Sequence, residues 1–180
     1  MGTARAGAAD PAAGIFPGAA MTTGLIEMAE HQPQRVAVVH GQVGNAEFDD
    51  FLARAFGEVR ALLADQHRTA AGPPFARYRA TGRGMDVEAG LPVDDGVRPA
   101  GRVTVETLPG GAMVTAPHQG DHGTVGFTYE TLLEWLAGNN CVATGDPWES
   151  YVDLPGASPV TVVTVPCRRL PPLPPRPLHN

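Results

Sequence analysis

The sequence of 180 residues contains no lysine, and its thirteen basic residues are arginines that are scattered without forming a basic run. Its formal net charge at pH 7 is −6. Proteins that follow a phosphate backbone or attach to an anionic membrane surface carry clustered positive charge. We therefore expect neither direct nucleic-acid binding nor membrane attachment.

Cysteine is also scarce. The only two, Cys141 and Cys167, have neither the spacing of a metal site nor the number that a disulfide framework needs. The amino-terminal segment has no apolar run of signal-peptide length, and Gly2 is not followed by Ser or Thr at position 6, as N-myristoylation requires. These absences favour a cytoplasmic protein, whose natural start is either Met1 or Met21.

The length and the hydrophobic content of 43% are typical of one globular domain with a sizeable core. Residues 1–24 are rich in alanine and glycine without hydrophobic periodicity, and we predict that they are disordered. Residues 168–180 are rich in proline and are predicted to form an extended, polyproline-like, disordered tail. The folded domain is therefore placed at residues 25–167.

A short pattern occurs twice. Pro147–Tyr151 repeats Pro74–Tyr78, and each copy follows a segment with a helical period of apolar residues, at about 48–67 and 124–138. Because there are only two copies, a pseudo-symmetric single domain fits better than a repeat array. The matched positions are Phe75 with Trp148, Ala76 with Glu149, and Tyr78 with Tyr151.

Further segments carry the alternation and the turn residues of β-strands. In the first half we predict one long or bent strand, broken near Pro33, and a hairpin after the helix. In the second half we predict two strands that pair with each other before the helix, and two more after it. The predicted strands are 25–43, 75–80, 85–93, 103–107, 113–114, 148–152 and 160–165.

Alternation also orients the residues of the second copy. Successive side chains of a strand point to opposite faces of its sheet. Trp148 and Ser150 are therefore expected on one face, and Glu149 and Tyr151 on the other.

Five short motifs follow one another along the chain: GPPFARY at 72–78, DVEAGLPV at 86–93, LPGG at 108–111, HQG at 118–120 and PWESY at 147–151. Together they resemble the GyrI-like small-molecule-binding family, within the AraC-type effector-binding superfamily, over residues 27–166. The resemblance implies an α+β fold in which a duplicated β-α-β-β module forms one curved, mostly antiparallel sheet. It also implies two helices on one face and a ligand cleft at the pseudo-two-fold axis.

The same resemblance suggests functions. In multidrug-sensing regulators of the family, the glutamate of the Trp-Glu motif meets cationic aromatic drugs. Some stand-alone members are cyclopropanoid cyclopropyl hydrolases, which open the cyclopropane of DNA-alkylating natural products and so protect the producer. The first 24 residues are too few for a helix-turn-helix region, so we do not expect this chain to be a transcription regulator itself.

Two classes of function therefore compete. The first is an enzyme that detoxifies a flat, hydrophobic, genotoxic natural product by hydrolytic opening of a cyclopropane ring. The second is a non-catalytic protein that sequesters a drug, protects a target such as gyrase, or senses an effector for a separate regulator. In both classes the partner is a hydrophobic aromatic small molecule, and the protein is a monomer or a homodimer.

The catalytic residues expected for the enzyme are Glu149, Tyr78 and Tyr151. Glu149 acts as general base on a water, and the two tyrosine hydroxyls orient that water or donate to the substrate carbonyl. The competing interpretation is a solvated glutamate on an edge strand with tyrosines in ordinary core packing. Four ligand-binding residues are expected beside them: Phe75 and Trp148, which sandwich a flat ring, with His118 and Met113.

We expect no cofactor and no metal. The segment His118–His122 departs from the usual His-x-Gly-Pro-Tyr of the family, because Asp121 and His122 stand where Pro-Tyr is common. The two histidines are close in sequence, but the loop offers no clear third ligand, which argues against zinc.

Overall fold

The structure, a computed structural model, describes residues 26–82, 84–120, 122–152 and 160–171. The predicted disordered segments 1–24 and 168–180 lie largely outside these ranges. The elements in chain order are β1 (Glu27–His31), β2 (Gln34–Val43), α1 (Phe48–Asp65), β3 (Phe75–Thr81), β4 (Gly84–Pro92), β5 (Thr104–Leu108), β6 (Gly111–Gln119), α2 (Val125–Gly138), β7 (Cys141–Ala143), β8 (Trp148–Val152) and β9 (Val160–Arg169). A single 3-10 turn precedes each helix, at Asn45–Glu47 and His122–Thr124.

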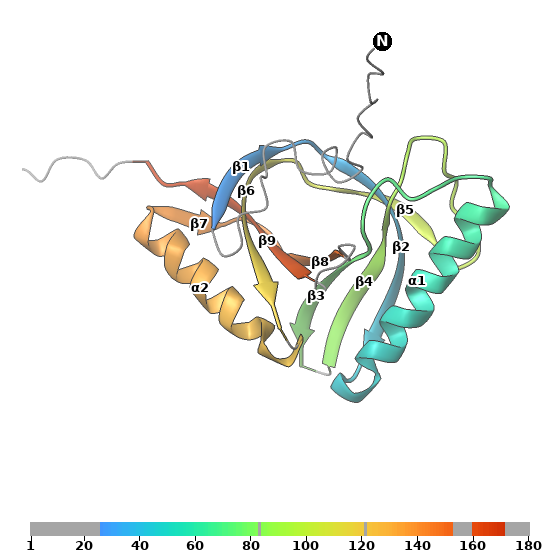
Figure 1. Cartoon of the computed structure of the whole chain (residues 1–180), viewed down its shortest axis with the longest axis horizontal. Helices are drawn as coiled ribbons and strands as arrows, with labels where there is room; N and C mark the ends of the chain where they lie inside the picture. Colours follow the sequence, from blue (N-terminus) through green and yellow to red (C-terminus); the bar gives the residue numbers. More distant parts are fainter. Residues whose placement is uncertain (1–25, 83, 121, 153–159, 172–180) are drawn as a thin grey trace, which may run out of the picture.

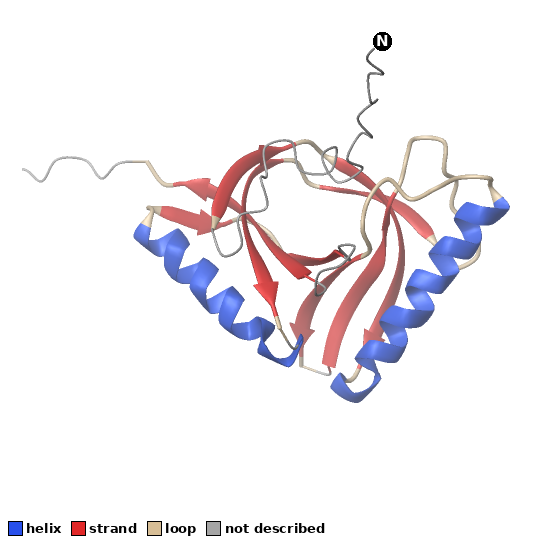
Figure 2. Ribbon diagram, viewed as in Figure 1, coloured by secondary structure: helices blue, strands red, loops and turns tan. Residues whose placement is uncertain are grey.

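The fold is α+β, as predicted. One curled antiparallel sheet has the strand order β1-β6-β9-β8-β3-β4-β2-β5, and β7 pairs with β9 beside this path. Two helices cover one face of the sheet, α1 over β2 and β4, and α2 over β6, β7 and β9 (Figures 1 and 2). The midpoint of the strand order lies between β8 and β3, which are counterparts in the duplication.

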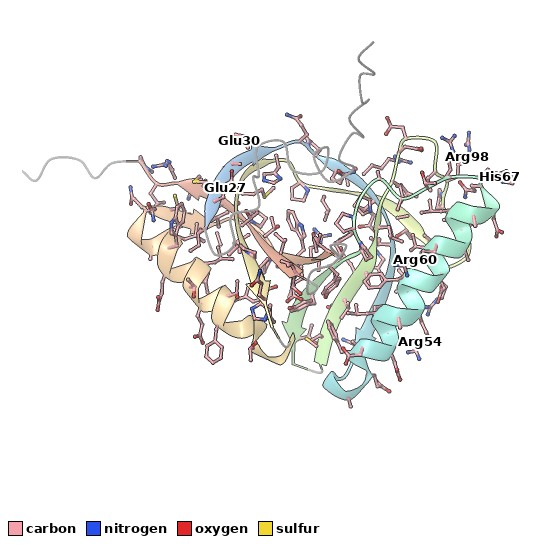
Figure 3. The ribbon with its side chains drawn as sticks, viewed as in Figure 1. Glu27, Glu30, Arg54, Arg60, His67 and Arg98 are labelled. Carbon is pink, nitrogen blue, oxygen red and sulfur yellow. The ribbon has the colours of Figure 1, made fainter. Side chains whose placement is uncertain are left out.

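Helix α1 forms because its apolar residues recur at three- and four-residue spacing. Seven of them are buried against the sheet, and charged residues such as Arg54 and Arg60 are exposed (Figure 3). Helix α2 buries only three residues and has a smaller apolar contact with its half of the sheet. The helix predicted at 48–67 ends two residues earlier, at Asp65, and the helix predicted from 124 begins at Val125.

The break near Pro33 is confirmed, but the single strand over residues 25–43 and the mutual pairing of the two strands before α2 were wrong. Residues 25–43 form two strands with different partners, because β1 pairs with β6, while β2 pairs with β4 and β5. The strands at 104–108 and 111–119 are not partners of each other: β5 pairs with β2 of the first half, and β6 pairs with β1 and β9. The chain passes from one half of the sheet to the other at the tight turns after β1 and after β5. The first strand of each half therefore pairs with a strand of the other half.

The sheet buries side chains on both faces. Under the helices lie two clusters, one around α1 with Ala37, Val39, Val87 and Leu91, and one around α2 with Val114, Val163 and Val165. A third cluster lies on the opposite, inner face of the curl. It consists of Val36, Val38, Phe75, Leu108, Met113 and Trp148.

The ends of the domain in the structure suggest a test of where the folded part begins and ends. Strand β9 continues to Arg169, and the Leu170 amide donates to the Asn140 carbonyl oxygen at 2.8 Å. We expect a chain of residues 25–171 to retain one cooperative thermal unfolding transition, because every buried apolar cluster among the described residues lies inside it. Circular dichroism during heating measures this. Loss of the transition would contradict the boundaries.

Candidate functional site

Glu149 lies at the centre of the sheet, in β8. Its side chain is fully buried. In the register its neighbours are Ala76 on β3 and Val163 on β9, both also fully buried. Val163 packs in the cluster under α2 and Ala76 in the cluster under α1. The carboxylate therefore projects from the helix-bearing face, at the boundary between the two halves.

Three tyrosine hydroxyls converge on this carboxylate. Tyr78 from β3 donates to Glu149 Oε1, and Tyr129 from α2 donates to the same oxygen at 3.1 Å. Tyr151, two residues along β8, donates to Glu149 Oε2 at 3.2 Å. The chain has three tyrosines in all, so every tyrosine hydroxyl of the protein hydrogen-bonds to one carboxylate. We call these four residues the tyrosine–glutamate cluster.

The cluster is electrostatically one unit. Burial, together with the neighbouring Glu149 carboxylate, raises the pKa of the Tyr78, Tyr129 and Tyr151 hydroxyls well above the usual value for a phenol. A phenolate beside a buried carboxylate is disfavoured, because both would be negative in a medium of low dielectric. The three hydroxyls therefore keep their protons and act as donors throughout the physiological pH range.

Helix α1 fixes two of the tyrosine rings. Phe48 meets Tyr78 edge to face, with ring centroids 5.5 Å apart at 85°. Phe56 meets Tyr151 at 6.0 Å and 62°. Edge-to-face contacts of this kind hold a ring in one orientation. The site therefore depends on three strands or helices beyond β8, namely β3, α1 and α2.

The duplication explains part of this arrangement. Tyr78 and Tyr151 are counterparts in the two halves, as the sequence pattern indicated, and they bind the two different oxygens of Glu149. The counterpart of Glu149 is Ala76, which stands opposite it in the register. Tyr129, on α2, has no tyrosine counterpart in the first half, so the two halves do not contribute equally to the cluster.

Three of the expected ligand residues do not join this cluster. Phe75, Trp148 and Met113 pack together with Val36 and Val38 in the third cluster, on the inner face of the sheet. The structure thus places Trp148 and Glu149 on opposite faces, as strand alternation predicted. It does not bring the expected aromatic sandwich beside the carboxylate.

His118 is on the helix-bearing face, in the row that continues through Thr161 to Tyr151. It is buried, and its ring nitrogens make hydrogen bonds with Thr128 Oγ1 at 2.9 Å and Thr124 Oγ1 at 3.3 Å. In the first half the matching position is Gly41, where a Cβ would overlap the Phe51 ring. Through its hydrogen bonds with the two threonines, His118 holds the start of α2 against the sheet.

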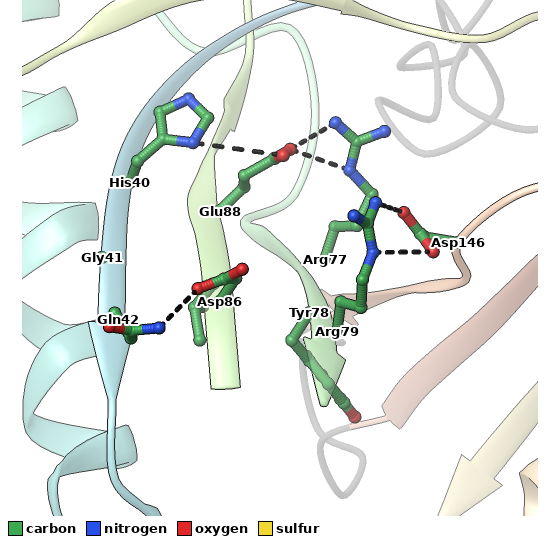
Figure 4. A pocket seen from close by; sticks show the side chains of 10 residues that line it. His40, Gly41, Gln42, Arg77, Tyr78, Arg79, Asp86, Glu88 and Asp146 are labelled. Carbon is green, nitrogen blue, oxygen red and sulfur yellow. Dashed lines mark hydrogen bonds and ion pairs between the residues drawn. The ribbon is translucent and has the colours of Figure 1, made fainter. Parts of the chain in front are cut away.

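A separate cavity of about 410 Å³ opens beside β2, β3 and β4. Half of its ten lining residues are charged, namely Arg77, Arg79, Asp86, Glu88 and Asp146 (Figure 4). The Tyr78 side chain points away from these residues (Figure 4). Alternation along β3 explains this, because Arg77 and Arg79 face the inner side while Tyr78 faces the helices. The Tyr78 hydroxyl and its Glu149 partner thus lie on the face opposite the charged lining, although Tyr78 itself borders the cavity.

Comparison with known proteins identifies the domain. The model of the GyrI-like small molecule binding domain family matches residues 26–165. The chain belongs to this family. GyrI-like domains bind small molecules, which is the function that this membership assigns. No curated protein sequence matches the chain.

Solved structures place this GyrI-like domain among distant relatives of the same fold. The EcmrR–DNA complex matches with a TM-score of 0.70 at 20% identity, over 83% of this chain and 59% of that chain, so the domain spans little more than half of EcmrR. A hydrolase from Listeria innocua matches with a TM-score of 0.61 at 12% identity, over 81% and 93% of the chains. SAV2435 bound to tetraphenylphosphonium matches with a TM-score of 0.56 at 14% identity, over 80% and 98%.

Within the described ranges there is no group of three or more His, Cys, Asp or Glu side chains that could hold a metal ion. In the same residues, no helix is long and apolar enough to cross a membrane.

Proposed function

We propose that this GyrI-like domain binds a flat, hydrophobic small molecule against the tyrosine–glutamate cluster and hydrolyses it by opening a cyclopropane ring. The observation that carries the proposal is a fully buried carboxylate that accepts hydrogen bonds from three tyrosines. Such a cluster pairs a base with proton donors, as general acid–base catalysis requires. The likeness to a hydrolase from Listeria innocua supports the same class of reaction.

The proposed reaction adds one water to a cyclopropane fused to a conjugated dienone. The water oxygen forms a bond to the cyclopropane carbon while a carbon–carbon bond of that ring breaks. The electron pair moves to the dienone oxygen, which becomes a phenolate as the ring turns aromatic. Glu149 takes the proton that the water loses, and a tyrosine hydroxyl donates a proton to the phenolate oxygen. The tyrosine then recovers its proton from Glu149, so the cluster returns to its starting state.

The helices supply the apolar contacts for such a ligand. Leu133 lies four residues after Tyr129, hence on the same side of α2, and its side chain is 55% exposed. On α1, Phe56 is half-buried against Tyr151. An exposed leucine next to a cluster of aromatic rings is surface that a hydrophobic ligand would cover.

Leu133→Ala is therefore expected to weaken binding of a planar aromatic ligand by about 1 kcal/mol, the value of a partly buried leucine side chain. Phe127→Ala is the matched control. Phe127 is 71% exposed on the same helix, but lies two residues from Tyr129 and so points to nearly the opposite side. Titration of a fluorescent flat ligand measures both affinities. Equal affinities for the two variants, or weakening by Phe75→Ala or Trp148→Ala alone, would move the ligand elsewhere.

A second candidate function is sequestration of a lipophilic cation without turnover. A carboxylate framed by tyrosine rings attracts such a cation by charge and by cation–π interaction. The likeness to SAV2435, whose structure contains tetraphenylphosphonium, favours this candidate.

Mass spectrometry separates the two functions. Purified protein is incubated with a cyclopropane-bearing DNA alkylator, and the small molecule is analysed after extraction. The hydrolase is expected to return a product heavier by one water, at a rate above that in buffer. Return of the alkylator unaltered, together with saturable binding, would assign sequestration instead.

A further inference from the structure

The cavity on the inner face is lined by two rows of polar side chains. Across β2, β4 and β3, the register aligns His40, Glu88 and Arg77 in one row. The next row is Gln42, Asp86 and Arg79. Residues opposite each other in an antiparallel pair have Cβ atoms about 5 Å apart, so each row is a continuous band of donors and acceptors.

Ion pairs neutralise most of the charge in these rows. Arg77 donates through Nε, at 2.8 Å, and through Nη2 to Glu88 Oε2. Arg79 turns away from its own row and binds both oxygens of Asp146. That ion pair holds the pKa of the Asp146 carboxyl below its usual range. Both arginines of the cavity are thus already bound to carboxylates.

Asp86 differs from the other acidic residues of the cavity. In the described part of the chain its carboxylate accepts one hydrogen bond, from Gln42 Nε2 at 3.3 Å, and forms no ion pair. The lining contains two arginines and three carboxylates. The arginines pair with Glu88 and Asp146, so Asp86 is the carboxylate of this lining that is left without an arginine partner.

We propose that this cavity is a second ligand site, for a small hydrophilic cation of the alkylamine or short diamine class, with Asp86 as its anchor. An ammonium group donates to Asp86 and to the acceptor oxygens of Glu88, which lies two residues along the same face of β4. A hydrophilic ligand suits the cavity better than a flat aromatic one, since six of its ten lining residues are charged or amide side chains.

The second site is distinct from the proposed catalytic cluster. Strand β3 contributes to both: Arg77 and Arg79 face the cavity, whereas Tyr78, which also borders the cavity, donates its hydroxyl to Glu149 on the helix-bearing face. An amine in the cavity and an aromatic ligand at Glu149 therefore occupy opposite sides of the sheet.

Calorimetric titration with putrescine at low ionic strength tests this site. Asp86→Asn preserves shape and is expected to weaken putrescine binding about tenfold, the effect of losing one charge-assisted hydrogen bond. Asp65→Asn removes the same charge from the exposed end of α1, and is expected to leave the affinity within twofold. Glu149→Gln is likewise expected to bind putrescine as the wild type does, so failure of the hydrolase proposal would leave this result unchanged.

Three outcomes would overturn the second site. The first is the absence of saturable putrescine binding to the wild-type protein. The second is an equal loss of affinity in Asp86→Asn and Asp65→Asn, which would indicate attraction to net negative charge only. The third is wild-type affinity in both Asp86→Asn and Asp86→Ser, each shown by its thermal transition to be folded.

Discussion

Glu149→Gln is expected to lower hydrolytic turnover by about 10²–10⁴-fold, the usual contribution of a positioned general base. Glutamine keeps the shape of the side chain and accepts hydrogen bonds from the tyrosines, but it cannot take the proton of the attacking water. Binding of a neutral substrate is expected to stay within a few-fold of wild type. The measurement is the rate of product formation by mass spectrometry, with a separate titration for affinity.

The same variant distinguishes the two candidate functions. If Glu149 holds a lipophilic cation, Glu149→Gln weakens tetraphenylphosphonium and leaves neutral aromatic ligands unchanged, because only the charge has been lost. Glu134→Gln, an exposed position on α2, controls for the change of net charge. Full hydrolytic activity with glutamine at position 149 would exclude the proposed base.

Gly90→Ala is expected to cause a large loss of stability. Gly90 lies in β4 between Val38 and Phe75, and a Cβ there would overlap the Ala37 carbonyl oxygen of the neighbouring strand. Main-chain atoms in the middle of a sheet cannot move aside as a flexible side chain can. We expect the free energy of unfolding to fall by about 3 kcal/mol, the upper end of ordinary overpacking. Denaturant titration measures it.

Gly57→Ala is the matched control for that measurement. Gly57 is exposed within α1, and a Cβ there would meet nothing within 4 Å. Alanine is favoured over glycine in a helix interior, so this variant is expected to gain about 0.5–1 kcal/mol. A loss in Gly57→Ala, or no change in Gly90→Ala, would contradict the packing of the sheet around these residues.

The helices and the hairpin were predictable because their signals are local. The apolar period in 48–65 and the turn at 81–84 each need only a few neighbouring residues. The exchange of β1 and β5 between the halves was not predictable in this way, since an alternating pattern states which face is buried and not which strand lies alongside. The alternating pattern of β5 is compatible with β6 or with β2 as its neighbour in the sheet.

The candidate site, too, was only partly predictable from the sequence. Alternation along the strand already placed Trp148 and Glu149 on opposite faces, yet both residues were expected in one ligand cleft. Tyr129 was missed altogether, because a tyrosine within an amphipathic helix resembles any other core residue. A signal was nevertheless present: with Tyr78 and Tyr151 expected at the site, Tyr129 was the one tyrosine of the chain left unassigned.

The pairing of Ala76 with Glu149 sets a condition on how such a site can arise. These two residues are equivalent in the duplication and face each other across the pseudo-two-fold axis. A homodimer of the second half would place two glutamates there, and one would have to remain protonated because adjacent carboxylates cannot both ionise freely. Fusion into one polypeptide removes that conflict. One half retains the acid, the other contributes a methyl group beside it, and the lone carboxylate on the axis is available only to a chain whose two copies have diverged.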